Sequence, residues 1–369
     1  MAVLRLAFVW ESLGPSHCDR IAAVAAAGYP AAGIEFSGES CTYQWEHGAP
    51  AGGRRITLTG PGERPGPVRL GWRLFRAVRA NRAQAAFLCH YQLPAVFFAA
   101  LALRLTGCRV FAMIDSKFDD RPRSLWIEGV KGLLLAPYNG VLAGSRRTAE
   151  YMHFLGFRRR AVTGGFDSLD LARVRQPDSS GQTVDHARRD FLIVARLVPK
   201  KNLAFALRAY AAWLATAVHP RKLRIVGYGP EETGLRQLAA ELEIADKIIF
   251  SGLASSAQVY RAMRRALCLV LPSVEEQFGL VVIEALALGV PVLVSGKAGA
   301  VDALVDNGVN GWIIDPLRPQ ALITAMSLLD RDPAVWANAR DAAATSAERG
   351  DVCHFVDGVR ALLGPAKRD

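Results

Sequence analysis

Short apolar runs alternate with longer segments of helical period along almost the whole chain. Leu4–Trp10 and Val110–Ile114 are such runs in the first half, and Phe191–Ala195, Ala266–Leu271 and Val290–Val294 follow in the second. This alternation is typical of parallel β-strands that are joined by crossover helices and buried on both faces. Because 369 residues exceed what one hydrophobic core usually organises, the sequence predicts an α/β protein with two doubly wound domains.

A change in composition near the middle of the chain sets the expected domain boundaries. Pro, Asp, Ser, Gly and Gln follow one another within 176–190, which we interpret as a linker. An N-terminal domain over 1–175 and a C-terminal domain over 191–345 would flank this linker. The final helical segment, 346–369, is a candidate to pack back on the N-terminal domain. The Gly- and Pro-rich stretch 48–67 is predicted to be a loop.

The chain carries an excess of positive charge, and most of the excess lies in its first half. There are 45 Lys and Arg against 34 Asp and Glu, and residues 1–180 hold 23 of these basic residues and 14 of the acidic ones. Four arginines are spaced to form one stripe of a helix: Arg73, Arg76, Arg79 and Arg82. The stripe is either an ordinary solvated face or a peripheral contact with anionic lipid. No nucleic-acid-binding motif accompanies it, so we expect no nucleic-acid partner.

Neither a membrane span nor a metal site is expected from the sequence. The most apolar stretches, Leu93–Leu103 and Gly279–Ser295, fall short of the roughly 20 residues that a helix needs to cross a bilayer. The six cysteines lie at irregular intervals without zinc-ligand spacing, as expected of buried thiols in a reducing compartment. The chain begins with an expected strand rather than a signal peptide, so we predict a cytoplasmic protein, either free or at the inner face of the membrane.

The most informative pattern of the chain is a pair of glutamates around an apolar helix. Glu276 and Glu284 lie eight positions apart, and Gly279 between them opens the helix. The free amides at the start of such a helix, on Gly279, Leu280 and Val281, form an anion site. A carboxylate inside an apolar helix is costly unless it is hydrogen-bonded, and a sugar diol would supply that bond. The segment is therefore predicted to bind a phosphate and sugar hydroxyls.

This pair of glutamates resembles the Glu-x7-Glu signature of the retaining glycosyltransferases of family 4, which belong to the glycosyl transferases group 1. Members of that family have the GT-B fold, in which two Rossmann-like domains face a central cleft. Further motifs of the C-terminal half resemble the same family: Ala195–Asn202, Val226–Pro230, Phe250–Leu253, Asn310–Trp312 and Asp315–Pro316. The resemblance is looser in the N-terminal half, where Val141–Ser145 and Gly164–Asp167 match.

The resemblance implies donor-binding roles for residues of the C-terminal half. Arg196 and Lys201 would neutralise the diphosphate of a nucleotide sugar, including the charge that develops on the leaving group. Glu276 would bind hydroxyls of the transferred sugar, and Glu284 would bind the ribose of the nucleotide. The amides at the start of the helix would contact the same phosphates. Because fixed cations and amides handle this charge, we expect neither a metal nor another cofactor.

Two further donor contacts are expected on loops at strand ends. Leu253 and Ala254 would lie against the nucleotide base, which their backbone contacts. Gly14 follows the first strand and would allow the backbone to approach the donor from the opposite domain.

The acceptor side of the site departs from the family pattern. Asp115 stands where many members carry a histidine, and we expect it either to face the cleft as a catalytic group or to cap a turn. His90, at the end of an earlier strand, is a candidate substitute for that histidine. His17 is a further candidate for binding the acceptor or the sugar.

Together these residues predict a hexosyltransferase that uses a nucleotide diphosphate sugar and a carbohydrate or lipid-linked acceptor. Its expected role is the assembly of a cell-surface polysaccharide or glycolipid. Two alternatives stay open at this point: a sugar-nucleotide epimerase of GT-B-like fold, and a non-catalytic protein that binds a nucleotide sugar. The product separates the first from a transferase, and tight binding without turnover would indicate the second.

Overall fold

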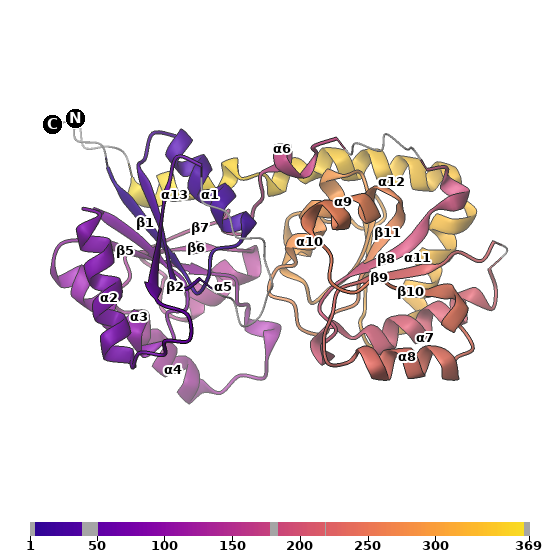
Figure 1. Cartoon of the computed structure of the whole chain (residues 1–369), viewed down its shortest axis with the longest axis horizontal. Coiled ribbons are helices and arrows are strands. Elements are labelled where there is room, and N and C mark those ends of the chain that lie inside the picture. The colour runs from indigo at the N-terminus through magenta and orange to yellow at the C-terminus, as the bar shows by residue number, and fades with distance from the viewer. Residues whose placement is uncertain (1–3, 39–50, 178–183, 218, 365–369) are drawn as a thin grey trace. The chain divides into compact units, whose positions relative to one another are not determined.

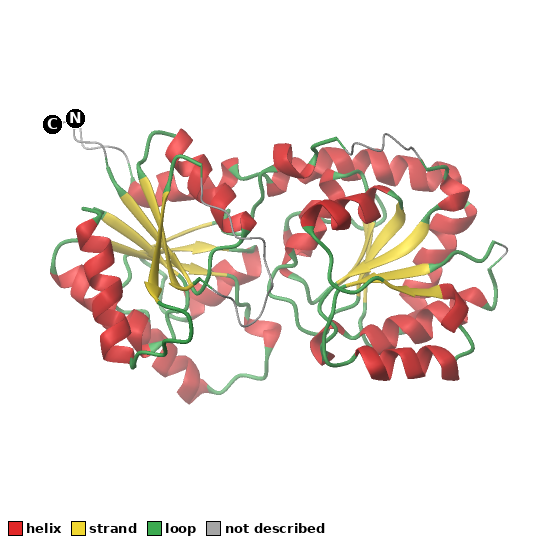
Figure 2. Ribbon diagram, in the orientation of Figure 1, coloured by secondary structure: helices red, strands yellow, loops and turns green. Residues whose placement is uncertain are grey.

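The computed structural model describes residues 4–38, 51–177, 184–217 and 219–364, and the chain divides into two compact units. Unit 1 comprises Met1–Asp170 together with Asp351–Asp369, and unit 2 comprises Leu171–Gly350. Each unit is built around one parallel sheet with helices on both faces, as Figures 1 and 2 show. The prediction of two Rossmann-like α/β domains is confirmed.

The divisions between the units differ from the boundaries drawn from the sequence. The first falls after Asp170, ahead of the expected linker, because helix α6 (Leu171–Val174) packs on α10 (Leu280–Ala287) of unit 2. Residues 178–183 of that linker lie outside the described residues. The second division falls after Gly350, and helix α13 (Cys353–Leu363) then packs on unit 1.

The sheet of unit 1 has the strand order β3-β2-β1-β4-β5-β6-β7, with parallel pairing throughout. Its strands are β1 (Leu6–Trp10), β2 (Ala31–Ser37), β3 (Arg54–Thr59), β4 (Ala85–Leu88), β5 (Arg109–Ile114), β6 (Gly140–Ala143) and β7 (Ala161–Thr163). The helices connecting them are α1 (Pro15–Ala26), α2 (Pro67–Ala80), α3 (Pro94–Leu105), α4 (Leu125–Leu134) and α5 (Arg146–Phe154).

Strand β1 shows how the two faces of this sheet are covered. Ala7 and Val9 belong to the core formed with α2, α3 and α5, whereas Phe8 and Trp10 belong to the core formed with α1 and α13. This period of two places successive side chains on opposite faces of the sheet. Helices therefore bury both faces, as a parallel sheet requires.

Strand β3 overturns the expectation that 48–67 is a loop. It pairs with β2 from Ala32 opposite Arg54 to Ser37 opposite Thr59. Arg55 of β3 forms an ion pair with the fully buried Glu35 of β2, with 2.8 Å between Nε and Oε1. The Gly and Pro residues around this segment favour a loop in the sequence. The strand forms nevertheless at the edge of the sheet, where it pairs with β2 and Arg55 contacts Glu35.

The sheet of unit 2 has the order β10-β9-β8-β11-β12-β13, again with parallel pairing. Its strands are β8 (Asp190–Val194), β9 (Leu223–Val226), β10 (Ile248–Phe250), β11 (Ala266–Leu271), β12 (Val292–Ser295) and β13 (Gly311–Ile314). Besides α6 and α10, the α-helices described in this unit are α7 (Leu203–Leu214), α8 (Glu232–Glu241), α9 (Ser256–Arg264), α11 (Pro319–Arg331) and α12 (Pro333–Ser346). Helices α7, α8 and α11 contribute to one core with β8, β9 and β11.

Candidate functional site

The predicted donor-binding residues of unit 2 gather at the point where its strand order reverses. Strands β8 and β11 are neighbours, although the chain leaves β8 toward β9 and leaves β11 toward β12 on the other side. Ligands of open α/β sheets bind at the carboxyl ends of two such strands. Arg196 and Lys201 follow β8, and Glu276 and Gly279 follow β11. The structure therefore places these four residues on loops at the same edge of the sheet.

Lys201 and Glu276 are in direct contact at this edge. The Nζ atom of Lys201 forms an ion pair with Oε2 of Glu276. The hydroxyl of Ser273 donates a hydrogen bond of 3.0 Å to the same oxygen, and Glu276 is only 7% exposed. The carboxylate is thus held in a defined position by a cation and a hydroxyl. Ser273, which the sequence did not single out, lies three residues before Glu276 on the same loop.

Lys200 and Glu275, which precede Lys201 and Glu276 in the chain, form a second ion pair between the same two loops. The Nζ and Oε1 atoms of the two residues lie 3.6 Å apart. Asn202, in the left-handed conformation, donates from Nδ2 to the carbonyl of Pro316 at 2.8 Å. This bond ties the loop after β8 to the segment that follows β13, so the backbone that carries Lys201 is anchored.

The glycine-rich turn after β9 supports the loop that carries Arg196. A Cβ atom on Gly227 would lie 1.9 Å from the carbonyl oxygen of Ala195, and one on Gly229 would lie 2.4 Å from that of Leu197. Only glycine allows such close approach of two backbones. The turn and the loop are also joined by a hydrogen bond of 2.9 Å from the amide of Leu197 to the carbonyl of Tyr228. These contacts give the two glycines a packing role.

Gly279 begins helix α10 in a conformation that favours glycine. Its φ is +99°, and the helix runs from Leu280 to Ala287. The amides of the first turn of a helix lack intrahelical partners and carry the positive end of the helix dipole. The start of α10, with Leu280 and Val281, follows the loop that carries Glu276, so a phosphate bound there would lie close to the carboxylate and its lysine.

Glu284 lies half-buried on α10 and is hydrogen-bonded to a tyrosine of α9. The hydroxyl of Tyr260 donates to Oε1 of Glu284 at 3.2 Å, and Nη1 of Arg173 donates to that hydroxyl at 3.0 Å. Burial raises the pKa of Tyr260, so the phenol stays protonated and remains a donor. Sequence reasoning missed Tyr260 and Arg173 because neither lies near Glu284 in the chain.

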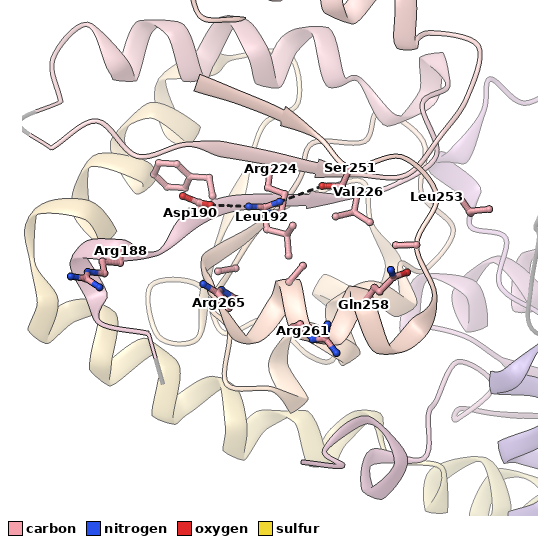
Figure 3. Close-up of a pocket in the computed structure, with 14 residues that line it drawn as sticks. Arg188, Asp190, Leu192, Arg224, Val226, Ser251, Leu253, Gln258, Arg261 and Arg265 are labelled. Atoms are coloured by element: carbon pink, nitrogen blue, oxygen red, sulfur yellow. Dashed lines mark hydrogen bonds and ion pairs between the residues drawn. The ribbon is translucent and has the colours of Figure 1, made fainter. Parts of the chain in front are cut away.

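Leu253 and Ala254 line a cavity of about 370 Å³ in unit 2. The cavity starts at these residues, beyond the end of β10, and extends to Asp190 and Ala266 at the beginnings of β8 and β11. Figure 3 shows Gln258 and Arg261 of α9, and Arg265 just after it, on one side of the cavity. Arg224 lies on the opposite side, where it contacts Asp190 and Ser251. Arg196, Lys201, Glu276 and Glu284 do not line this cavity. The strand-end loops, where cations, carboxylates and helix amides meet, are therefore the better candidate for the reacting groups.

The predicted residues of unit 1 lie at the corresponding reversal of its own sheet. Strands β1 and β4 are neighbours there, with Gly14 and His17 following β1 and His90 following β4. The amide of Gly14 donates to Nδ1 of His17 at 2.9 Å. Burial, aided by the neighbouring Arg20, lowers the pKa of His17 well below its ordinary value, and burial also lowers that of His90. His17 is thus a neutral imidazole that carries its proton on Nε2.

The conformation of Gly14 itself does not require glycine, because its φ is −97° and its ψ is −179°. The loop is instead held by Glu35, whose Oε2 accepts a hydrogen bond of 2.8 Å from the amide of Leu13. The ion pair of Glu35 with Arg55 thus has a consequence for the site, because it fixes the backbone just ahead of Gly14.

Asp115 directly follows β5, and its side chain is half-buried. Burial raises the pKa of this carboxyl, and nearby Asp120 raises it further. The carbonyl of Asp115 accepts a hydrogen bond of 3.0 Å from the hydroxyl of Thr148 on α5. The backbone at Asp115 is therefore fixed at the carboxyl end of the sheet, next to the strand that ends before His90.

Only part of the expected arginine stripe lies on one helix. Arg73, Arg76 and Arg79 lie on α2, whereas Arg82 follows its last residue, Ala80, and has a left-handed backbone conformation, so it does not continue the stripe. Arg73 forms an ion pair with Glu63, with 2.7 Å between Nη2 and Oε1, whereas Arg76, Arg79 and Arg82 are exposed. The side chain of Trp72 is also exposed and stacks on Phe75. None of the helices in the described part of the chain combines the length and apolarity that crossing a bilayer requires. The described residues also contain no cluster of three or more His, Cys, Asp or Glu side chains placed to hold a metal ion.

Solved structures of similar fold identify the fold of this chain. Sucrose-phosphate synthase from Thermosynechococcus elongatus is similar over 98% of both chains, with a TM-score of 0.76 and 18% identity. HepE from Anabaena, solved in complex with UDP and glucose, is similar over 98% of this chain and 99% of its own, with a TM-score of 0.75 and 18% identity. At this identity the likeness shows the fold alone, which is the GT-B fold of glycosyltransferases.

The sequence comparisons find similarity in unit 2. Residues 175–349, which make up most of unit 2, match the model of the glycosyl transferases group 1. D-inositol 3-phosphate glycosyltransferase from Acidothermus cellulolyticus is 35% identical over 184 residues, which cover 47% of this chain and 39% of that protein. The chain spans between 33% and 49% of the length of eight such curated relatives.

Proposed function

We propose that this protein is a retaining glycosyltransferase of family 4 that transfers a hexosyl unit from a nucleotide diphosphate sugar to an acceptor hydroxyl. The observation that carries the proposal is the meeting of the Lys201–Glu276 ion pair, Arg196 and the start of α10 at the carboxyl ends of β8 and β11. Cations and helix amides suit a diphosphate, and fixed carboxylates suit sugar hydroxyls. The match of residues 175–349 to the glycosyl transferases group 1 supports the same class of reaction.

On the donor side, catalysis rests on the charge that develops on the leaving diphosphate. Arg196, Lys201 and the first amides of α10 stabilise this charge from fixed positions, which costs little reorganisation during the reaction. Because these groups supply positive charge, we propose that transfer requires no metal ion. Glu276 binds hydroxyls of the transferred sugar, and Glu284, held by Tyr260, binds the ribose.

Transfer with retention proceeds on one face of the sugar. The bond between the anomeric carbon and the diphosphate oxygen breaks with its electron pair on the leaving group. A new bond forms from the acceptor oxygen to the anomeric carbon, and the acceptor proton passes to an oxygen of the departing phosphate. The leaving group thus serves as the base, so the proposal assigns no protein side chain to that task.

Unit 1 supplies acceptor binding in this proposal. His17, His90 and Asp115 all follow strands of one sheet at its carboxyl edge, where polar groups can select a hydroxyl-rich acceptor. Neutral His17 is suited to donate a hydrogen bond from Nε2 to a sugar oxygen. We propose a carbohydrate or lipid-linked acceptor and a role in assembling a cell-surface polysaccharide or glycolipid, at the cytoplasmic side.

The decisive experiment is a ligand screen followed by product analysis. UDP-, GDP- and ADP-sugars are compared by thermal shift, since a donor present at 100 times its Kd stabilises the protein by about 2.7 kcal/mol. The best donor is then incubated with candidate acceptors in the presence of EDTA. Release of free nucleotide diphosphate together with a glycosylated acceptor is expected. An epimerised donor, or tight binding without any turnover, would contradict the proposal.

A further inference from the structure

Helix α4 of unit 1 exposes its apolar side chains to solvent. Leu125 is 83% exposed and Trp126 is 81% exposed, and Ile127, Val130 and Leu133 are also exposed. A helix on the surface of a soluble domain normally turns its apolar face toward the core. The apolar face of α4, formed by these five residues, is therefore available to bind something outside unit 1.

The polar side chains of α4 face inward, where a hydrogen-bond network holds them. Glu128 is only 4% exposed, and its Oε1 accepts a bond of 2.8 Å from Nζ of Lys131. Both residues contact the hydroxyl of Tyr151 on α5, which donates to Glu128 and accepts from Lys131 at 2.9 Å. Nη1 of Arg123 donates to the same hydroxyl at 3.1 Å. This buried network fixes the helix with its apolar face outward, so the exposure is built into the fold.

Aromatic side chains extend the apolar surface beside this network. Phe118 and Phe154 are each about half exposed and meet edge to face, with 5.4 Å between ring centroids. The guanidinium of Arg123 lies 5.7 Å from the ring centroid of Phe118 and 4.6 Å from that of Tyr151. Because Arg123 also bonds to the network under α4, the phenylalanine pair belongs to the same region of unit 1.

Basic residues flank both ends of α4. Arg121 is exposed just before the helix, and Arg158 and Arg159 are exposed in the run that ends with Arg160. Nη1 of Arg160 donates to the carbonyl of Leu135 at 3.0 Å, which places this run beside the C-terminal end of α4. Residues 51–160, which form helices α2 to α5, carry 19 Lys and Arg but only six Asp and Glu. The single carboxylate of α4 is the buried Glu128.

We propose that α4 docks on an anionic lipid bilayer, with its apolar face inserted at the interface and the flanking arginines on the lipid phosphates. An exposed apolar stripe with a tryptophan, bordered by cations, has the composition of a helix that lies in a membrane interface. Attraction to anionic lipid adds to the apolar contribution. A second copy of the chain fits less well, because arginines border both ends of α4, so a symmetric contact through this helix would bring arginines of the two copies together in either orientation. The proposal goes beyond sugar transfer and does not depend on turnover.

The location of the contact is tested with the full chain and vesicles of phosphatidylcholine mixed in equal parts with phosphatidylglycerol. With brominated lipid, the tryptophan fluorescence of the wild type is expected to be quenched. Trp126→Phe should lose most of this quenching, whereas Trp72→Phe, the matched change at the exposed tryptophan of α2, should keep it. If the quenching is instead lost in Trp72→Phe, the contact lies on α2 and the α4 proposal is wrong.

The strength of binding is tested by sedimentation with the same vesicles. Leu125→Ser combined with Trp126→Ser should weaken binding about tenfold or more. Arg158→Gln with Arg159→Gln should weaken it by roughly fivefold per arginine at low salt, and pure phosphatidylcholine should bind poorly. An unchanged far-UV circular dichroism spectrum and an unchanged urea-unfolding curve show that each variant remains folded. No vesicle binding at low salt, or a concentration-dependent dimer that Leu125→Ser with Trp126→Ser abolishes, would overturn the proposal.

Discussion

Lys201 and Glu276, 75 residues apart in the chain, form an ion pair that joins the loops after β8 and β11. The pair keeps a largely buried carboxylate next to a cation before any substrate is bound. A donor diphosphate would compete with Glu276 for the ammonium group, while the sugar hydroxyls would take up the carboxylate. In the proposed function, phosphate binding and sugar binding would therefore be linked through this one contact.

Lys201→Met is expected to lower kcat/KM by about 10²–10³, because it removes a fixed cation from the leaving group. Donor affinity, measured by calorimetry with the nucleotide diphosphate, should fall as well. Lys200→Met is the matched control: the lysine is adjacent on the same 3₁₀ turn, but it contacts Glu275 rather than Glu276. Equal losses of kcat/KM in the two variants would mean that Lys201 acts only as one positive charge among others near the site, and that its contact with Glu276 has no role.

Tyr260→Phe tests the proposed ribose contact of Glu284. The change removes the hydroxyl that donates to Oε1 of Glu284 at 3.2 Å while the ring stays in place. The loss of one hydrogen bond, about 0.5–1.5 kcal/mol, corresponds to a rise of roughly 2–12-fold in the KM for the donor. We expect kcat to change little, because the ribose lies away from the bonds that break and form. Steady-state kinetics check this, and a large fall in kcat at constant KM would place Glu284 closer to the chemistry.

The sequence predicted the elements whose signals are local. Continuous apolar runs predicted the central strands, with β11 matching at both ends, and the segment around the two glutamates predicted a helix that begins near Gly279. Contacts made in three dimensions stayed hidden. The contact of Tyr260 with Glu284 joins two helices, and β3 depends on Arg55 meeting a buried glutamate. The sequence did not predict helix α4. Its Glu128 is buried and its apolar side chains are exposed, which is the reverse of the pattern by which surface helices are usually recognised.

Gly279→Ala should destabilise unit 2 and weaken the anion site together. At a φ of +99° an alanine is strained by about 1–2 kcal/mol, and its Cβ would lie 3.1 Å from Cδ2 of Leu271. The same change at Gly234 in α8 is the control: its Cβ would meet nothing within 4 Å, so helix propensity should stabilise the protein by up to about 1 kcal/mol. Urea unfolding and nucleotide-diphosphate binding measure the two effects. Full stability and affinity in Gly279→Ala would contradict the role assigned to this helix start.

His17→Gln should flatten the dependence of stability on pH in the acid range. Burial holds the pKa of His17 in the folded protein well below the value of 6.5 that an unperturbed imidazole has. As the pH falls below about 6.5, the unfolded chain therefore takes up a proton that the folded protein does not, and the free energy of unfolding decreases by up to about 1.4 kcal/mol per pH unit. Glutamine retains an acceptor for the amide of Gly14 but does not titrate. Urea unfolding at pH 7.5 and pH 5.5 should show similar stabilities of the two proteins at the higher pH and a smaller acid loss for the variant. Equal acid losses would mean that His17 takes up a proton in the folded state.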